Sequence, residues 1–203
     1  MKLRTTLLAS VAAILTAALA AQAQVPGVNS TLNSVFTLAY DNSTMKPSYS
    51  ASVASATAVS AQTDMCSLSG SATKTVKVRR IFFSNVPTTA VSEPVAILKR
   101  STANTGAGSA IPKVAYDTSN AASSVAVAEL WTAAPTVGTL TGVIADLVFN
   151  FPISTGAVVP AKFEFGQLAQ PIVLRGAAQS VAVNLSGITL TGTVGCTFEW
   201  TEE

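Results

Sequence analysis

The sequence predicts an all-β protein folded as a β-sandwich, a jelly roll or a related Greek-key arrangement of about ten short strands. Three observations support this class. Apolar and polar residues alternate with a period of two in many short segments, Gly and Pro separate these segments, and no segment beyond the N-terminal region has a helical period.

Residues 1–23 are predicted to be a secretory signal peptide of bacterial type. Lys2 and Arg4 give a positive start, an uncharged apolar run covers 7–20, and residues 21–23 (Ala-Gln-Ala) form a small-x-small cleavage site. The apolar run is short for a membrane span, which needs about 20 residues. We therefore expect a secreted or periplasmic protein without a membrane span after cleavage.

Cleavage would lower the count of Lys plus Arg from 12 to 10, equal to the 10 Asp plus Glu, so the mature chain would be neutral. A neutral chain has no electrostatic reason to bind nucleic acid. Charged residues make up only 11% of the sequence, where about 25% is usual. Solubility then depends on few charges, which favours self-association.

The two cysteines, Cys66 and Cys196, are predicted to form a disulfide, because an exported chain folds in an oxidising compartment. The alternative is two buried free thiols. In the chain-entropy model, closing so long a loop stabilises the fold by about 4–5 kcal/mol. Two thiols without a histidine cannot complete a zinc site, so we expect no metal and no cofactor.

The first segment of the mature chain, 24–63, is predicted to be a leader with weak strands. Alternation over 36–40 and again over 49–53 suggests two strands, whereas the Ser- and Ala-rich segment 50–63 fits a connector equally well. The sandwich domain itself is predicted to cover 64–203.

The segment 74–84 is predicted to be a long strand with an irregularity. Val76 and Ile81 each begin an apolar alternation, but they are five positions apart, an odd offset that places the two alternations on opposite faces. Side chains alternate strictly along a strand, so we expect a β-bulge or bend near Arg79 and Arg80.

The other expected strands share short length and flanking Gly or Pro. They are 66–70, 94–100 beginning at Pro94, 114–116, 125–131, 142–151, 161–165, 171–176, 179–185 and 193–200. In 142–151, Val143, Ala145, Leu147 and Phe149 are expected to share one face. Residues 101–124 form the longest polar, Gly-containing segment, and we expect this loop to point outward and to carry function.

The absence of histidine excludes Ser-His-Asp and Cys-His nucleophile pairs and the commonest general base, so we expect no enzyme. A two-carboxylate glycan hydrolase is the least favoured alternative. Its candidate acids are Asp117, Glu129, Asp146, Glu164 and Glu199.

Two aromatic residues, Trp131 and Tyr116, could stack on sugar rings, since each adjoins a predicted loop. They make a carbohydrate-binding module the main alternative function. Trp200 shares an apolar stripe with Val194 and Phe198 and is predicted to lie in the core.

Several stretches resemble structural proteins of the virion or tail region of tailed phages and prophages. These stretches, which span about residues 64–203, are SGSATKTVKVRRI (69–81), ILKRSTANTGAGSA (97–110), ELWTAAPTVGTLTG (129–142), VLRGAAQSVAVNLSGITLTG (173–192) and FEWTEE (198–203). The resemblance implies a jelly-roll-like sandwich that assembles, often as a trimer, and it implies no catalytic residues. The signal peptide departs from this family and favours an exported relative.

Together these observations predict an exported, non-catalytic structural or adhesive module. Its expected partner is a second copy of itself, with a surface glycan or protein as a further partner.

Overall fold

The computed structural model describes residues 46–57, 64–120, 125–153, 159–166, 170–186 and 191–203. These residues contain strands and no helix, which confirms the predicted all-β class. The predicted signal peptide and the strand expected over 36–40 lie outside the described residues. The 12 strands are β1 Ser48–Thr57, β2 Asp64–Ser69, β3 Thr75–Val86, β4 Val91–Arg100, β5 Gly108–Ala110, β6 Lys113–Ala115, β7 Val127–Trp131, β8 Leu140–Phe151, β9 Ala161–Glu164, β10 Ile172–Arg175, β11 Ser180–Asn184 and β12 Thr193–Glu202.

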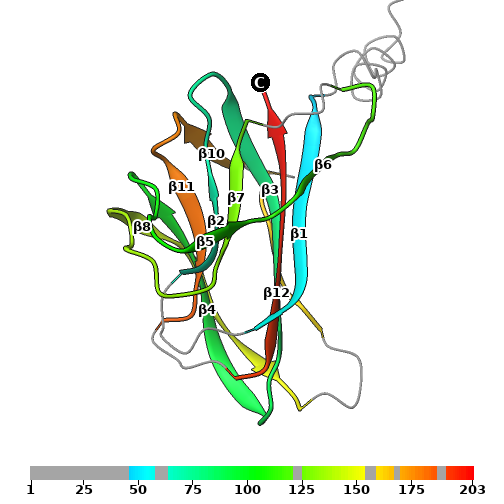
Figure 1. The fold of residues 1–203 in the computed structure, drawn as a ribbon, viewed down its shortest axis with the longest axis vertical. Helices are drawn as coiled ribbons and strands as arrows, with labels where there is room; N and C mark the ends of the chain where they lie inside the picture. Colours follow the sequence, from blue (N-terminus) through cyan, green and yellow to red (C-terminus); the bar gives the residue numbers. More distant parts are fainter. Residues whose placement is uncertain (1–45, 58–63, 121–124, 154–158, 167–169, 187–190) are drawn as a thin grey trace, which may run out of the picture. The chain divides into compact units, whose positions relative to one another are not determined.

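The strands form two six-stranded antiparallel sheets, which face each other as two layers (Figure 1). Sheet A has the order β10-β3-β12-β1-β6, with β9 also paired to β3, and sheet B has the order β5-β7-β2-β11-β4-β8. The pairing is nested along the chain: β1 pairs with β12, β2 with β11, β3 with β9 and β10, and β4 with β8. A hairpin whose strand pairs alternate between two sheets in this way is a jelly roll.

The segment between β4 and β8 widens both sheets. Its strands β5 and β7 extend sheet B beyond β2, and β6 extends sheet A beyond β1. The prediction that 101–124 forms one outward loop is therefore wrong. The short strand expected at 114–116 is present as β6. Strands of three residues are too short to show periodicity, and backbone groups at the edges of β1 and β7 pair with them.

The sandwich starts earlier than predicted. β1 lies inside sheet A between β12 and β6, so the compact unit begins at Lys46 rather than at residue 64. Its alternation is weak in the sequence because most of its residues are Ser and Ala, so inward positions such as Ala51 differ little in size from the outward Ser52.

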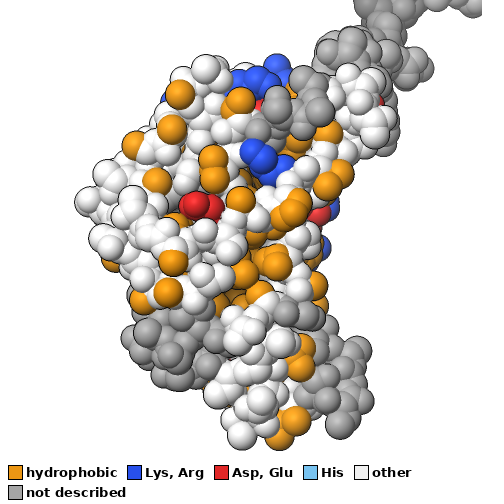
Figure 2. Space-filling model, in the orientation of Figure 1, with side chains coloured by type: hydrophobic (Ala, Val, Ile, Leu, Met, Phe, Trp, Pro, Cys, Tyr) orange, Lys and Arg blue, Asp and Glu red, His pale blue; other side chains and the backbone are white. Residues whose placement is uncertain are grey.

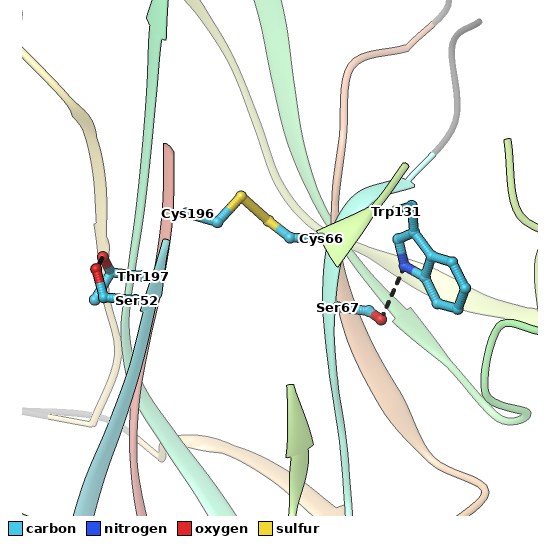
Figure 3. Close-up of a disulfide and its surroundings, with 6 residues drawn as sticks. All are labelled: Ser52, Cys66, Ser67, Trp131, Cys196 and Thr197. Atoms are coloured by element: carbon cyan, nitrogen blue, oxygen red, sulfur yellow. Dashed lines mark hydrogen bonds between the residues drawn. A yellow bond between two sulfur atoms is a disulfide. The ribbon is translucent and has the colours of Figure 1, made fainter. Parts of the chain in front are cut away.

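The predicted disulfide is confirmed and joins the two sheets. Cys66 on β2 and Cys196 on β12 are bonded, with their Cα atoms 6.6 Å apart. Figure 3 shows the bond in the space between the layers. It indicates a non-reducing, extracytoplasmic environment.

The predicted β-bulge is confirmed at Arg79. In the ladder with β12, Arg80 pairs with Glu199 and Val78 pairs with Trp200, which leaves Arg79 as the extra residue. Arg79 and Arg80 are consecutive and both exposed. The bulge thus turns two neighbouring guanidinium groups towards solvent.

The prediction that Pro94 begins its strand is wrong. β4 starts at Val91, so Pro94 is its fourth residue and pairs with Val148 of β8. Pairing with β11 begins only at Ala96. Among the described residues, one side of β4 has no ladder partner at Pro94, so the missing N–H of this proline is tolerated there.

A buried carboxylate, that of Asp64, fixes the segment between β4 and β8. It is 1% exposed and accepts from Arg100 Nε at 2.6 Å, Arg100 Nη2 at 2.8 Å, Asn104 Nδ2 at 2.7 Å and Asn184 Nδ2 at 2.8 Å. Arg100 and Asn104 also bond the backbone of Gly138, where a side chain would overlap the carbonyl of Thr102. Both ends of the segment are thereby bound at one point.

Replacing Asp64 should destabilise the fold strongly. In Asp64→Asn a single amide oxygen faces four donors and leaves Arg100 buried without a counter-ion, which costs about 3–5 kcal/mol. The measurement is the free energy of unfolding in urea. The control is Asp117→Asn, an exposed site where the amide keeps the turn with Ser119, and it should change stability by less than about 0.5 kcal/mol. Equal losses in the two variants would contradict the assigned role of Asp64.

A second buried carboxyl, Glu93, pairs with Asn85 between the sheets. Both side chains are 0% exposed, and Asn85 Nδ2 donates to Glu93 Oε1 at 3.0 Å. The remaining oxygens of the pair, Asn85 Oδ1 and Glu93 Oε2, have no donor. Burial raises the pKa of Glu93 above its ordinary value. A protonated Glu93 would supply the missing donor, and the two groups would then satisfy each other as an acid–amide pair.

The stability of the fold should depend on the protonation of Glu93. Its folded pKa is raised, so the stabilisation is complete below the unfolded value near 4.5 and is lost as pH rises through the folded pKa. Glu93→Gln keeps a neutral pair at every pH. We expect wild type to lose stability relative to Glu93→Gln by up to about 1.4 kcal/mol per pH unit in that window, measured by urea unfolding. A difference that is independent of pH would show that Glu93 is ionised in the fold.

Candidate functional site: a groove beside Tyr116 and the free edge of β8

The two aromatic residues expected to contact a ligand have different environments. Trp131 is 2% exposed, and its indole N–H donates to Ser67 Oγ at 3.1 Å. Figure 3 shows this ring on the side of β2 away from the disulfide, on the outer face of sheet B. Gly108 of β5 lies directly against the ring. Trp131 therefore packs beneath the added strand β5 and has no face free for a sugar.

Tyr116, in contrast, is exposed. It follows β6, its backbone N–H donates to Ser48 O at 2.9 Å, and its side chain is 58% exposed. Its hydroxyl interacts with Glu199 and Ser50. Burial of the hydroxyl, together with the Glu199 carboxylate, raises the pKa of Tyr116 to about 12. The hydroxyl end is thus fixed to sheet A while much of the side chain remains in solvent.

Tyr116 borders a groove on sheet A with a volume of about 460 Å³. The floor is formed by β1 and β12, and one wall by the bulge of β3 and the chain after β9. The lining groups are mixed: the guanidinium groups of Arg79 and Arg80, the carboxylate of Glu199, the hydroxyls of Ser48 and Thr201, and the ring of Phe165. Sequence analysis identified Tyr116 and the two-arginine bulge, but it did not bring them together.

Arg80 neutralises the acids beside this groove. Its Nε lies 3.1 Å from Glu164 Oε1, and its Nη1 lies 3.2 Å from Glu199 Oε2. Lys162 lies 2.8 Å from the same Glu164 oxygen, and this contact, supported by Arg80, lowers the pKa of Glu164. A glycosidase needs a carboxylic acid with a raised pKa to protonate the leaving group. The pair Glu164 and Glu199 therefore has the chemistry of an ion-pair cluster.

The other candidate acids lie apart from this cluster. Glu129 is on β7, where burial raises its pKa, and Asp146 is exposed on β8; both strands belong to sheet B. Asp117 lies in the turn after β6 and accepts a hydrogen bond from Ser119 N at 2.9 Å. The structure brings together only two of the five acids, with an arginine between them.

The edge strand β8 carries an exposed apolar surface. It ends sheet B, and among the described residues it pairs only with β4. Val143 and Leu147, expected to share one face with Ala145 and Phe149, are more than half exposed, whereas Ala145 and Phe149 are partly buried against the core. The ladder with β4 shifts register at two places, and no strand of the described residues pairs with the far side of β8. The exposed large apolar residues of β8 are Leu140, Val143, Ile144, Leu147 and Val148.

Few charges interrupt the surface of the protein. Asp146 is the only charged residue of β8. In Figure 2, apolar side chains recur across the face in view and charged groups are sparse. The described residues contain no group of three or more His, Cys, Asp or Glu side chains able to hold a metal ion. Among the same residues, no helix has the length and hydropathy needed to cross a membrane.

Comparisons of the chain with protein-family models, with curated proteins and with solved structures found no match. The resemblance to phage structural proteins therefore stays a prediction from the sequence.

The assigned environment of Tyr116 predicts an unusual titration. We expect one phenol to ionise near pH 12, followed by the change in absorbance at 295 nm, and Tyr116→Phe to remove this transition. In Glu199→Gln the neighbouring charge is gone, so the same transition should move to lower pH. If the transition that Tyr116→Phe removes lies near pH 10, the ordinary value for a phenol, the interaction between Tyr116 and Glu199 is contradicted.

Proposed function

We propose that this chain is an exported, non-catalytic structural or adhesive module that self-associates through the free edge of β8. The observation that carries the proposal is the exposure of five large apolar side chains on one edge strand, from 39% at Ile144 to 70% at Val148. Natural edge strands are usually protected by charges, Pro or a covering segment. This strand has 12 residues, a single charge and no Pro.

A second copy of β8 is the partner that fits this edge. Two copies related by a two-fold axis would pair antiparallel, satisfy the free backbone groups of both edges and bury their apolar side chains. Asp146 lies near the middle of the strand, so pairing about its centre would bring two carboxylates close together. This repulsion limits the strength and selects the register of association.

The composition of the mature chain supports the same proposal. Cleavage at residue 23 would leave a neutral protein with few charges, which does not repel its own copies. The resemblance to phage structural proteins also implies assembly, often as trimers. A two-fold pairing of β8 gives dimers, whereas a trimer would need a different pair of surfaces.

Self-association can be tested by sedimentation of the secreted chain, residues 24–203. We expect concentration-dependent association in the wild type and at least about tenfold weaker association in Val148→Lys, because the buried lysine would be desolvated. Asp146→Asn should strengthen association by removing the repulsion.

The matched control is Val127→Lys, which makes the same chemical change at an exposed residue of β7, a strand paired on both sides. Val127→Lys should associate like the wild type. A wild-type protein that stays monomeric at its solubility limit, or equal weakening in the two lysine variants, would refute the proposed interface.

A further inference from the structure

We propose that the groove beside Tyr116 is a binding site for a sugar that carries a carboxylate, with Arg79 as the residue that binds the carboxylate. This site lies on sheet A and does not depend on self-association through β8, which belongs to sheet B.

The first feature of the groove is the charge of its two arginines. Arg79 and Arg80 point to the same side only because the bulge adds one residue to β3. Arg80 is held between Glu164 and Glu199, whereas no carboxylate of the described residues lies within 4.0 Å of the Arg79 guanidinium. Glu203 is near enough for Arg79 to influence its pKa, but its carboxylate bonds Lys77 at 2.6 Å. Arg79 therefore gives the groove a positive charge without a paired anion.

The second feature of the groove is the fixed position of the Arg79 guanidinium. Arg79 Nη1 donates to the carbonyl of Gly166 at 3.1 Å, which holds the group at the groove wall and leaves other N–H donors. Gly166 has φ +81°, and a Cβ there would lie 2.7 Å from Nη1. A glycine at this position allows the backbone and the guanidinium to approach. A fixed, planar guanidinium matches the two oxygens of a carboxylate.

The third feature of the groove is the rest of the surface that a ligand would contact. Tyr116 is fixed at its hydroxyl by Glu199 and Ser50 and is 58% exposed, so its ring can stack on the C–H face of a pyranose. The Ser48 hydroxyl, which donates to the carbonyl of Lys46, can accept from a ligand, the Thr201 hydroxyl can donate and accept, and the Glu199 carboxylate can accept from sugar hydroxyls. A volume of about 460 Å³ suits a ligand of one or two sugar rings.

These features favour an acidic sugar over the two nearest alternatives. A neutral sugar would cover Arg79 and give it no counter-charge. The C-terminus of a peptide also presents a carboxylate, but it has no hydroxylated ring to use the exposed phenol and the surrounding hydroxyls. A uronic acid supplies the carboxylate, the ring face and the hydroxyls in one unit.

The test is calorimetric titration of the secreted chain with a galacturonic acid trimer, a galactose trimer and a short peptide with a free C-terminus. We expect the galacturonic acid trimer to bind at least about tenfold more tightly than the other two, a difference of about 1.4 kcal/mol. Its affinity should fall with added salt, because the contact with Arg79 is ionic.

Variants separate the two parts of the site. Arg79→Gln and Tyr116→Ala should each weaken binding of the galacturonic acid trimer at least about tenfold. Tyr116→Phe should keep most of the affinity because the ring remains. Arg175→Gln, which removes an exposed arginine on β10 outside the groove, is the matched control and should bind like the wild type. Thermal melts of all four variants establish that they are folded.

Three results would overturn the proposal: no binding of the galacturonic acid trimer at millimolar concentration, binding of the galactose trimer or the peptide as tight as that of the acidic sugar, or equal effects of Arg79→Gln and Arg175→Gln. Each outcome leaves the sedimentation of the protein unaffected, so a failure of this site and a failure of the β8 interface are distinguishable.

Discussion

The carboxylate of Asp64 fixes the segment between β4 and β8, on which much of the surface depends. Four donors from Arg100, Asn104 and Asn184 converge on it in a buried position, and two of these residues also bond Gly138 at the far end of the segment. With both ends fixed, the segment adds strands to both sheets. It covers Trp131 on sheet B and places Tyr116 beside the bulge on sheet A. The charged cluster at Asp64 therefore fixes the ends of the segment that carries Tyr116, one of the residues that line the groove.

The nested pairing of the jelly roll explains why one edge is covered and the other is free. The added strands extend the edges next to β1 and β2, while β8 ends sheet B on the opposite side. The Cys66–Cys196 bond crosses between β2 and β12, both inside their sheets, and so links the layers at the centre of the sandwich. The other edge strands of the described sheets, β5, β6, β9 and β10, have only three or four residues each, so β8 with 12 residues is the longest free edge. This contrast supports a role for β8 in assembly.

Much of the fold could be predicted from the sequence because it depends on local pattern. Alternation located most strands, and the mismatch between Val76 and Ile81 located the bulge to within one residue. Only some residues of the groove could be predicted, not the groove itself. The sequence identifies the two arginines and Tyr116, but their proximity depends on β6 pairing with β1 more than 60 residues before it in the chain. No local pattern encodes that pairing.

By itself, the sequence determined the all-β class, the bulge at Arg79 and the cysteines available for a disulfide, since each follows from residue type and spacing. The tertiary structure alone decided which apolar faces are covered. Trp131 is buried because β5 packs on it, and Val143 and Leu147 are exposed on β8, which no further described strand joins in sheet B. It also decided that Glu93 is buried against Asn85 and that Arg80, not Arg79, is neutralised. The physical reason is that burial and charge pairing depend on neighbours from distant strands, whereas alternation depends only on adjacent residues.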